Sequence, residues 1–198
     1  ILERTPVHPS FSAEEEEQGR RELKQLGLPD NTPFVCFHAR DSGYLEYALP
    51  SEDPARWQYH DYRDTDIQRY VPAAEQLTMK GYYAFRTGVA VNEALNTTNP
   101  RIIDYATNGR SDFLDIYLSA RCHFFICDTA GMSSVPLIFR KPIAWVNYIP
   151  LGLAPPWNSK DLFLPKKLWS TDGSRVLTFR EILSSDIGRF GKAEQYAQ

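Results

Sequence analysis

Residues 123–139 read HFFICDTAGMSSVPLIF, and this stretch decides the fold. Its first five residues, 123–127, are mostly apolar and predict a buried strand. The small and polar residues 128–134 predict a turn, and the apolar residues after them predict a helix that ends near Phe139. A buried strand, a turn and a helix in this order are the repeating unit of a parallel sheet covered by helices.

The same alternation continues on both sides of this unit. Further strands are predicted over residues 33–39, 82–86, 101–104 and 142–146. Further helices are predicted over residues 12–26, 65–81, 111–121 and 178–184. The fold class that this pattern indicates is α/β, a Rossmann-like three-layer αβα arrangement with a mainly parallel sheet.

The chain of 198 residues is long enough for one such domain with extensions. Residues 1–32 are expected to form a tail and a helix, residues 33–150 the α/β domain, and residues 151–198 an extension that packs back on it. Residues 40–64 are polar and aromatic without a sustained period, which predicts a long loop. Its rings would either stack on a sugar in a cleft or pack against one another.

The composition and the missing motifs exclude several classes of protein. A net charge of −3 argues against general nucleic-acid binding, which needs a basic surface. No apolar run approaches the roughly 20 residues that span a bilayer, and no signal-peptide layout is present, so we expect no membrane span and a cytoplasmic location. The three cysteines form no C-x-x-C pair and are expected to be buried thiols. The chain has no Walker loop, no G-x-G-x-x-G and no zinc spacing, so no cofactor and no metal site is predicted.

Polar residues follow two of the predicted strands, where parallel sheets bind their ligands. His38, Arg40 and Asp41 come after the first strand, and an arginine there can fork two hydrogen bonds onto a diphosphate. The alternative is a surface pair between Arg40 and Asp41. Residues 128–134 follow the strand that ends at Cys127, and their small side chains would let an anion approach the amides of a helix start.

The candidate ligand-binding residues of this second turn are Asp128, Thr129, Ala130, Gly131, Met132 and Ser133. An ordinary tight turn and helix cap would use the same residues. Taken together, the two strand ends could hold one diphosphate between Arg40 and the turn at Gly131. Asp104 ends a third strand and could accept from a ribose hydroxyl or a base amine, or could cap a loop.

Asp64-Thr65-Asp66 spells the D-x-D of metal-dependent sugar transferases. The same residues overlap a capping box that runs from Thr65 to Gln68, and we interpret them as helix capping. The charge on a departing diphosphate would then be neutralised by Arg40 and backbone dipoles.

Several segments together resemble a group of bacterial glycosyltransferases that is similar to the GT-B fucosyltransferases that use GDP-fucose. The matching segments are FHARD at 37–41, RDTDIQRY at 63–70, the stretch from Gly81 to Gly88, and SDFLDIY at 111–117 leading into Cys127. The resemblance runs from about Pro33 to Ile149 and more loosely through 166–169 and 177–182. It implies the C-terminal, donor-binding half of a GT-B fold.

The resemblance also implies roles for single residues. His38 would lie near the guanine and Arg40 on the diphosphate, while Asp115 would recognise the base and residues 129–132 would meet the phosphates. It implies sugar transfer with inversion, without a metal, from a GDP-linked donor to the hydroxyl of a glycan or another acceptor. The dipole of the predicted helix alone would also explain Asp115.

One departure concerns the residue after Arg40, which is often a second arginine in those fucosyltransferases and is Asp41 here. We expect the acceptor domain of the GT-B pair to lie outside this chain, and Asp41 or a residue of that domain to act as the catalytic base. Two rival hypotheses stay open. They are a non-catalytic nucleotide-binding module and a flavodoxin-like or dehydrogenase-like protein.

Overall fold

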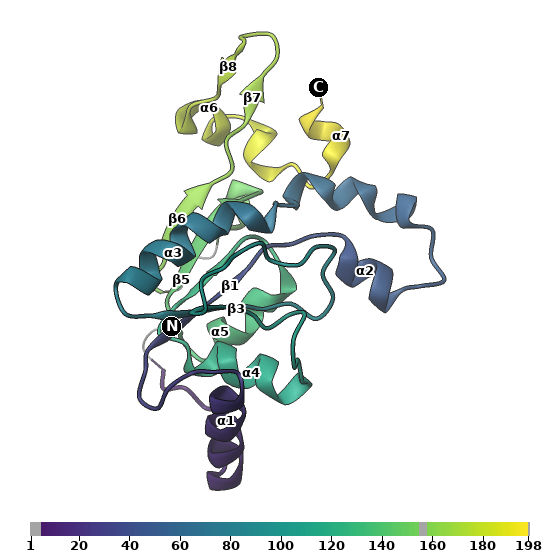
Figure 1. Ribbon diagram of the computed structural model, residues 1–198. Coiled ribbons are helices and arrows are strands. Elements are labelled where there is room, and N and C mark those ends of the chain that lie inside the picture. Colours follow the sequence, from purple (N-terminus) through teal and green to yellow (C-terminus); the bar gives the residue numbers. More distant parts are fainter. Residues whose placement is uncertain (1–4, 155–157, 198) are drawn as a thin grey trace.

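The computed structural model describes residues 5–154 and 158–197 (Figure 1). A six-stranded sheet forms its centre, and every neighbouring pair of strands is parallel. The strands are β1 (Phe34–His38), β2 (Tyr83–Arg86), β3 (Ile102–Asp104), β4 (Phe125–Cys127), β5 (Ile143–Tyr148) and β6 (Leu162–Pro165), in the spatial order β3-β2-β1-β4-β5-β6. The chain therefore builds outward from β1 in one direction and then crosses back to place β4 on the other side of β1.

Helices cover both faces of the sheet, which confirms the predicted three-layer α/β fold (Figure 1). The helices α1 (Ala13–Gln25), α4 (Asp112–Arg121) and α5 (Ser134–Ile138) pack on one face. On the other face lie the 3₁₀ helix η3 (Ile67–Tyr70) and α3 (Val71–Met79). The sheet is buried on both sides, and this explains why β1 and β4 read as continuous apolar runs rather than as alternating ones.

Local signals place several helix starts as expected. Ser12 caps α1 in a capping box, because its hydroxyl accepts from the Glu15 amide and the Glu15 carboxylate accepts from the Ser12 amide. The predicted cap at residue 65 is wrong by one position. Asp66, not Thr65, accepts the amide hydrogen of Gln68 and begins η3. The three cysteines are buried and free.

The predicted loop over residues 40–64 is largely helical. It contains α2 (Gly43–Ala48) and the 3₁₀ helix η2 (Pro54–Arg63), which lie beside the carboxyl ends of the strands. Asp53 starts η2 by accepting from the Ala55 amide. The prediction failed because a 3₁₀ helix repeats every three residues and η2 buries no residue fully, so no 3.6-residue apolar period marks it.

The extension after residue 150 is more structured than expected. It supplies β6 to the sheet and then forms the 3₁₀ helices η5 (Leu151–Leu153) and η6 (Asp186–Arg189), the hairpin β7 (Trp169–Ser170) with β8 (Arg175–Val176), α6 (Phe179–Leu183) and α7 (Ala193–Tyr196). The predicted late helix corresponds to α6. The first four residues of the predicted N-terminal tail, 1–4, lie outside the described residues. A further short 3₁₀ helix, η4 (Gly131–Ser133), directly precedes α5.

A glycine sets how closely α1 approaches α4. A Cβ at Gly19 would lie 2.2 Å from Cζ of Tyr117, whose ring is buried between the two helices. Tyr117 in turn donates a hydrogen bond to the Glu16 carboxylate at 3.0 Å, which fixes the ring.

Gly19→Ala should therefore lower the free energy of unfolding by about 1–3 kcal/mol, because the added methyl group overpacks this contact. This is the opposite of the gain of about 1 kcal/mol that alanine gives in an open helix. Urea unfolding followed by circular dichroism measures the difference, with Arg21→Ala on the exposed face of α1 as the control. A Gly19→Ala protein as stable as the control would contradict this account of the packing.

Candidate functional site

A cavity of about 500 Å³ lies at the carboxyl ends of β1, β2 and β4. The strand ends contribute His38, Arg40 and Asp41 after β1, residues 88–90 after β2, and Thr129, Ala130, Gly131 and Met132 after β4. The chain reverses its direction of growth between β1 and β4, and this is the point at which open α/β sheets bind ligands. Arg40 and Gly131 thus line one cavity, from two neighbouring strands.

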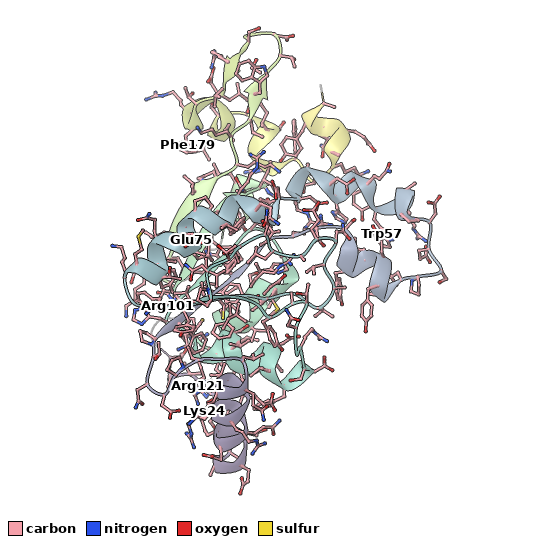
Figure 2. All side chains as sticks on the ribbon, viewed as in Figure 1. Lys24, Trp57, Glu75, Arg101, Arg121 and Phe179 are labelled. Carbon is pink, nitrogen blue, oxygen red and sulfur yellow. The ribbon has the colours of Figure 1, made fainter. Side chains whose placement is uncertain are left out.

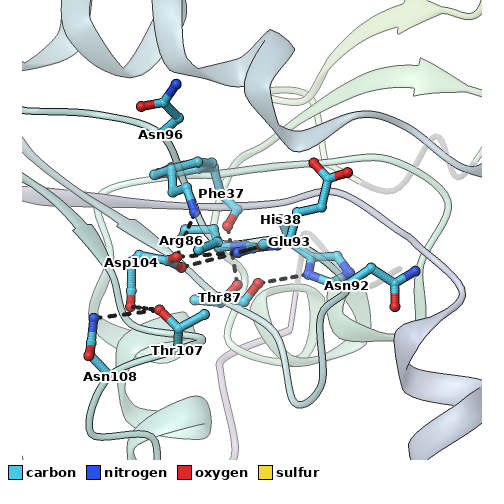
Figure 3. Close-up of polar contacts among 12 residues, drawn as sticks. Phe37, His38, Arg86, Thr87, Asn92, Glu93, Asn96, Asp104, Thr107 and Asn108 are labelled. Carbon is cyan, nitrogen blue, oxygen red and sulfur yellow. Dashed lines mark hydrogen bonds and ion pairs between the residues drawn. The ribbon is translucent and has the colours of Figure 1, made fainter.

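His38 is the last residue of β1, and its ring is fixed by the next strand. Nδ1 lies 2.9 Å from the carbonyl oxygen of Thr87, as Figure 3 shows. A carbonyl can only accept, so Nδ1 carries the proton of this hydrogen bond. In the neutral ring Nε2 is then a free acceptor on a side chain that lines the cavity.

Arg40 is held at its backbone and at its side chain. Its amide donates to Oδ2 of Asp128 at 2.9 Å, and its guanidinium forms an ion pair with Asp64 and contacts the His60 carbonyl oxygen at 3.4 Å. Both guanidinium contacts use Nη1, so Nη2 and Nε face no described partner. Burial lowers the pKa of Arg40, and the positive charge of Arg63 lowers it further.

Asp128 does not line the cavity. Its side chain is completely buried behind the tips of β1 and β4, where it accepts the Arg40 amide. Burial raises the pKa of Asp128, while His38 and the hydrogen bond from the Arg40 amide act in the opposite direction. Asp128 therefore links the end of β4 to the end of β1.

Asp41 lines the cavity, and its two oxygens already accept main-chain hydrogen bonds. Oδ1 accepts from the Gly43 amide at 3.0 Å and Oδ2 from the Asn92 amide at 3.1 Å. The carboxylate therefore links the start of α2 to the loop that follows β2. Among the described residues the Arg40 guanidinium forms its ion pair with Asp64 and none within 4.0 Å with the Asp41 carboxylate, so the alternative of a surface pair between Arg40 and Asp41 is not what the geometry shows.

The turn after β4 is held by its own hydroxyl groups. Thr129 Oγ1 donates to the Ile149 carbonyl oxygen at 2.6 Å, and Ser133 Oγ donates to the Ala130 carbonyl oxygen at 2.7 Å. Ser133 does not line the cavity, whereas Thr129 does. Gly131 begins η4 with an ordinary backbone angle, and a Cβ there would meet open space. Neither strain nor packing requires glycine at this position.

Asp104 lies outside the cavity, in a buried ion pair with Arg86 (Figure 3). Its Oδ1 is 3.2 Å from Nη1 of Arg86, and its Oδ2 accepts from the Leu95 amide at 2.8 Å. Arg86 is only 1% exposed and also donates to the Glu93 carbonyl oxygen at 2.6 Å. The pair thus fixes residues 88–95, whose first part forms one wall of the cavity.

Asp115 is also outside the cavity. It lies in the first turns of α4 and pairs with Arg110, whose Nη2 is 2.8 Å from its Oδ2. Burial raises the pKa of Asp115, and Arg110 partly offsets this effect. The structure therefore brings His38, Arg40, Asp41 and residues 129–132 together and leaves Asp104, Asp115, Asp128 and Ser133 out of the cavity lining.

The opposite wall comes from residues that the strand-end argument missed. Trp57, His60 and Arg63 of η2 line the cavity together with Tyr44 and Leu45 of α2. Trp57 lies on the segment beside α2 in Figure 2, and its Nε1 is buried without a hydrogen-bond partner. The cluster HDYR at 60–63 was a usable signal, because two basic side chains three residues apart share one side of a 3₁₀ helix.

His60 and Arg63 contact each other directly. Nη2 of Arg63 donates to Nδ1 of His60 at 2.6 Å, so this ring nitrogen is unprotonated. Burial lowers the pKa of His60, and the charges of Arg63 and Arg40 lower it further. The aromatic ring of Tyr62, between them in sequence, points away from the cavity and stacks on Tyr196 of α7 at 4.9 Å.

The C-terminal extension supports η2 from behind. Nζ of Lys166, just after β6, donates to the carbonyl oxygens of Tyr62 at 2.8 Å and Asp64 at 3.0 Å. Lys166 thus fixes the backbone on either side of Arg63. Within the described part of the chain, no helix is both long and apolar enough to cross a bilayer.

No family model and no curated protein matches this sequence. Among solved structures, the fold is similar to the crystal structure of the glycosyl transferase family 9 from Veillonella parvula, with a TM-score of 0.55 and 15% sequence identity. The match covers 92% of this chain and 53% of that one, so the chain spans about half the length of its structural neighbour. At this identity the likeness shows the fold alone, and it agrees with the three-layer architecture.

His60 should titrate below its ordinary pKa of about 6.5, and Arg63→Gln should move that pKa upward because it removes a repelling charge and the donor to Nδ1. The pKa is lower in the folded than in the unfolded chain. The unfolded chain therefore binds more protons at this residue than the folded chain does as the pH falls below about 6.5. Acidification thus lowers the free energy of unfolding through His60. NMR titration of the imidazole signals measures the shift. An unchanged His60 pKa in the variant would contradict the geometry.

Proposed function

We propose that this chain is the donor-binding half of a glycosyltransferase that moves a sugar from a nucleoside diphosphate to a hydroxyl group. The observation that carries the proposal is the shared cavity of Arg40 and Gly131 at the switch point of the sheet. The resemblance of residues 33–149 to GT-B transferases supports it, and so does the similarity of the fold to a family 9 glycosyl transferase.

Arg40 is the residue that stabilises the leaving diphosphate. Asp64 and the His60 carbonyl hold Nη1, which leaves the other edge of the guanidinium for phosphate oxygens. Negative charge grows on the diphosphate as its bond to the sugar breaks, and a preorganised cation lowers the free energy of that transition state more than that of the bound donor.

The turn after β4 binds the second side of the diphosphate. Gly131 and Met132 open η4, and amides at the start of a helix have no acceptor within that helix. A glycine that is free of strain and of packing contacts leaves these amides open to a phosphate. Thr129 keeps the turn in place through its two hydrogen bonds to residue 149.

The donor that we favour is a GDP-sugar. His38 meets the base, since its Nε2 can accept from a base N–H while Nδ1 stays bound to Thr87. Asp115 does not take part, because it pairs with Arg110 outside the cavity. Tyr44 and Trp57 offer rings to the apolar face of the sugar, and the unpartnered Trp57 Nε1 can donate to one of its hydroxyls.

Asp41 is the carboxylate among the described residues of the cavity lining, and we assign it as the base that removes the proton of the acceptor hydroxyl. Each of its oxygens accepts one amide and retains a lone pair for this role. The acceptor itself would bind to a second half of the enzyme, as in the GT-B arrangement.

One observation favours a second candidate function, a nucleotide-binding module without catalysis. Both Asp41 oxygens are committed to main-chain amides, which is what a purely structural carboxylate would also do. Turnover of GDP-sugars by the intact gene product separates the two functions. Release of GDP that depends on an acceptor identifies the transferase, and tight GDP binding without release identifies the module.

Calorimetric titration with GDP, UDP, CDP and ADP tests the site itself. We expect GDP to bind most tightly, and Arg40→Gln to weaken GDP binding about 10- to 100-fold because a charge-assisted hydrogen bond is lost. Equal and feeble binding of all four nucleotides would reject the proposed donor class.

Loss of Arg40 leaves Asp64 without its ion pair and could weaken GDP binding through folding. A second variant therefore tests the site without removing this ion pair. Gly131→Val places its side chain in open space and should keep the stability of the protein while it blocks the amides that face the phosphate. Gly191→Val, also with open space around Cβ but away from the cavity, is the matched control. If the two glycine variants bind GDP equally well, the turn at residue 131 is not a phosphate site.

A further inference from the structure

Arg63 is a cation in the cavity wall that lacks a carboxylate partner. No Asp or Glu oxygen lies within 4.0 Å of its guanidinium among residues 5–154 and 158–197, whereas Arg40 has Asp64. Its Nε is buried without a hydrogen-bond partner, and Nη2 is fixed on His60. Burying a donor of a charged group without an acceptor costs free energy. A guanidinium in a cavity lining without a carboxylate partner can attract an anionic ligand.

Arg40 and Arg63 approach the cavity from two different elements. Arg40 follows β1 and Arg63 ends η2, and the charge of Arg63 lowers the pKa of Arg40. Both guanidinium groups line one partly desolvated cavity. Asp64 pairs with Arg40 and Asp41 also lines the cavity, while Arg63 has no carboxylate partner. A ligand with two or more negative charges would convert this repulsion into attraction.

We propose that Arg63 is the second cation of a two-arginine clamp that grips the diphosphate of the donor between β1 and η2. The inference rests on the proposed function and names residues for it that neither the strand-end pattern nor the family resemblance assigns to binding. Position 41 carries an aspartate, so the neighbour of Arg40 in sequence cannot supply a second positive charge. Arg63, which also lines the cavity, supplies it from η2.

The surroundings of Arg63 suit this role. His60 is neutral at neutral pH and accepts from Nη2, which orients the guanidinium without neutralising it. Lys166 binds the backbone carbonyls on both sides of Arg63 and so holds the end of η2 against the domain. The clamp is therefore preorganised, and ligand binding does not have to order a flexible loop first.

A clamp of this kind distinguishes a diphosphate from a monophosphate. Arg40 with the turn at Gly131 can bind one phosphate group, and Arg63, a second cation in the lining, adds a charge-assisted contact to the next phosphate group. Removing Arg63 should therefore reduce the affinity for GDP much more than the affinity for GMP. This difference separates direct binding from a general loss of folding, which would weaken both ligands alike.

The experiment is calorimetric titration of the full chain with GDP, GMP and inorganic pyrophosphate. For Arg63→Gln we expect GDP and pyrophosphate affinities to fall about 10- to 100-fold and the GMP affinity to change less than about 3-fold. The GDP affinity of the variant should also depend less steeply on salt. Arg69→Gln, which removes an arginine that is 78% exposed and outside the cavity, should bind all three ligands as the unaltered protein does.

Equal GDP affinities for Arg63→Gln and Arg69→Gln would overturn the clamp and leave the proposed function standing. Absence of GDP and pyrophosphate binding by the unaltered protein would overturn both. If Arg63→Gln does not fold by circular dichroism, Arg63→Lys carries the test. Lysine keeps the positive charge but lacks the planar guanidinium that forms two parallel hydrogen bonds. A GDP affinity of Arg63→Lys that is measurable but weaker than that of Arg69→Gln supports the clamp. A GDP affinity equal to that of Arg69→Gln rejects it.

Discussion

The hydrogen bond from the Arg40 amide to the buried carboxylate of Asp128 is the interaction on which the rest of the site depends. It joins the tips of β1 and β4, the two strands between which the sheet reverses its order. With the backbone of Arg40 fixed there, its guanidinium lies in the cavity lining and contacts Asp64 and the His60 carbonyl oxygen. The turn that starts with Thr129 leaves the partner strand at the same level, and this is why one cavity receives both groups.

The walls of the cavity rely on polar contacts between separate elements. The buried Arg86–Asp104 pair fixes the loop after β2, and Asp41 ties that loop to the start of α2. Lys166 fixes the end of η2 in the same way, by binding main-chain carbonyls. The strand ends form the base of the cavity, and these three polar contacts from separate elements position the segments around it. A substitution at Asp104 or Lys166, neither of which lines the cavity, would therefore alter its shape indirectly.

Features that depend on local signals could be predicted from the sequence. The capping box at Ser12, the apolar run before His38 and the small residues after Cys127 placed a helix, a strand and a turn correctly, because each carries its own chemical signature. The convergence of Arg40 and Gly131 followed from the rule on strand ends in parallel sheets. These features determine the floor of the candidate site.

The loop after β2 and the helix η2, which surround the strand ends, could not be predicted, because their residues act through partners that are distant in sequence. Asp104 ends a strand, as a ligand-binding residue would, yet Arg86 lies directly opposite it in the neighbouring strand and pairs with it. The 3₁₀ helix η2 has no apolar period, and its cations enter the cavity only because Lys166 and Tyr196 support it. A crystal structure of the complex with GDP tests the central claim most directly. We predict that the diphosphate lies within hydrogen-bonding distance of both the Arg40 guanidinium and the amide of Gly131 or Met132, and a diphosphate bound away from either group would contradict this account.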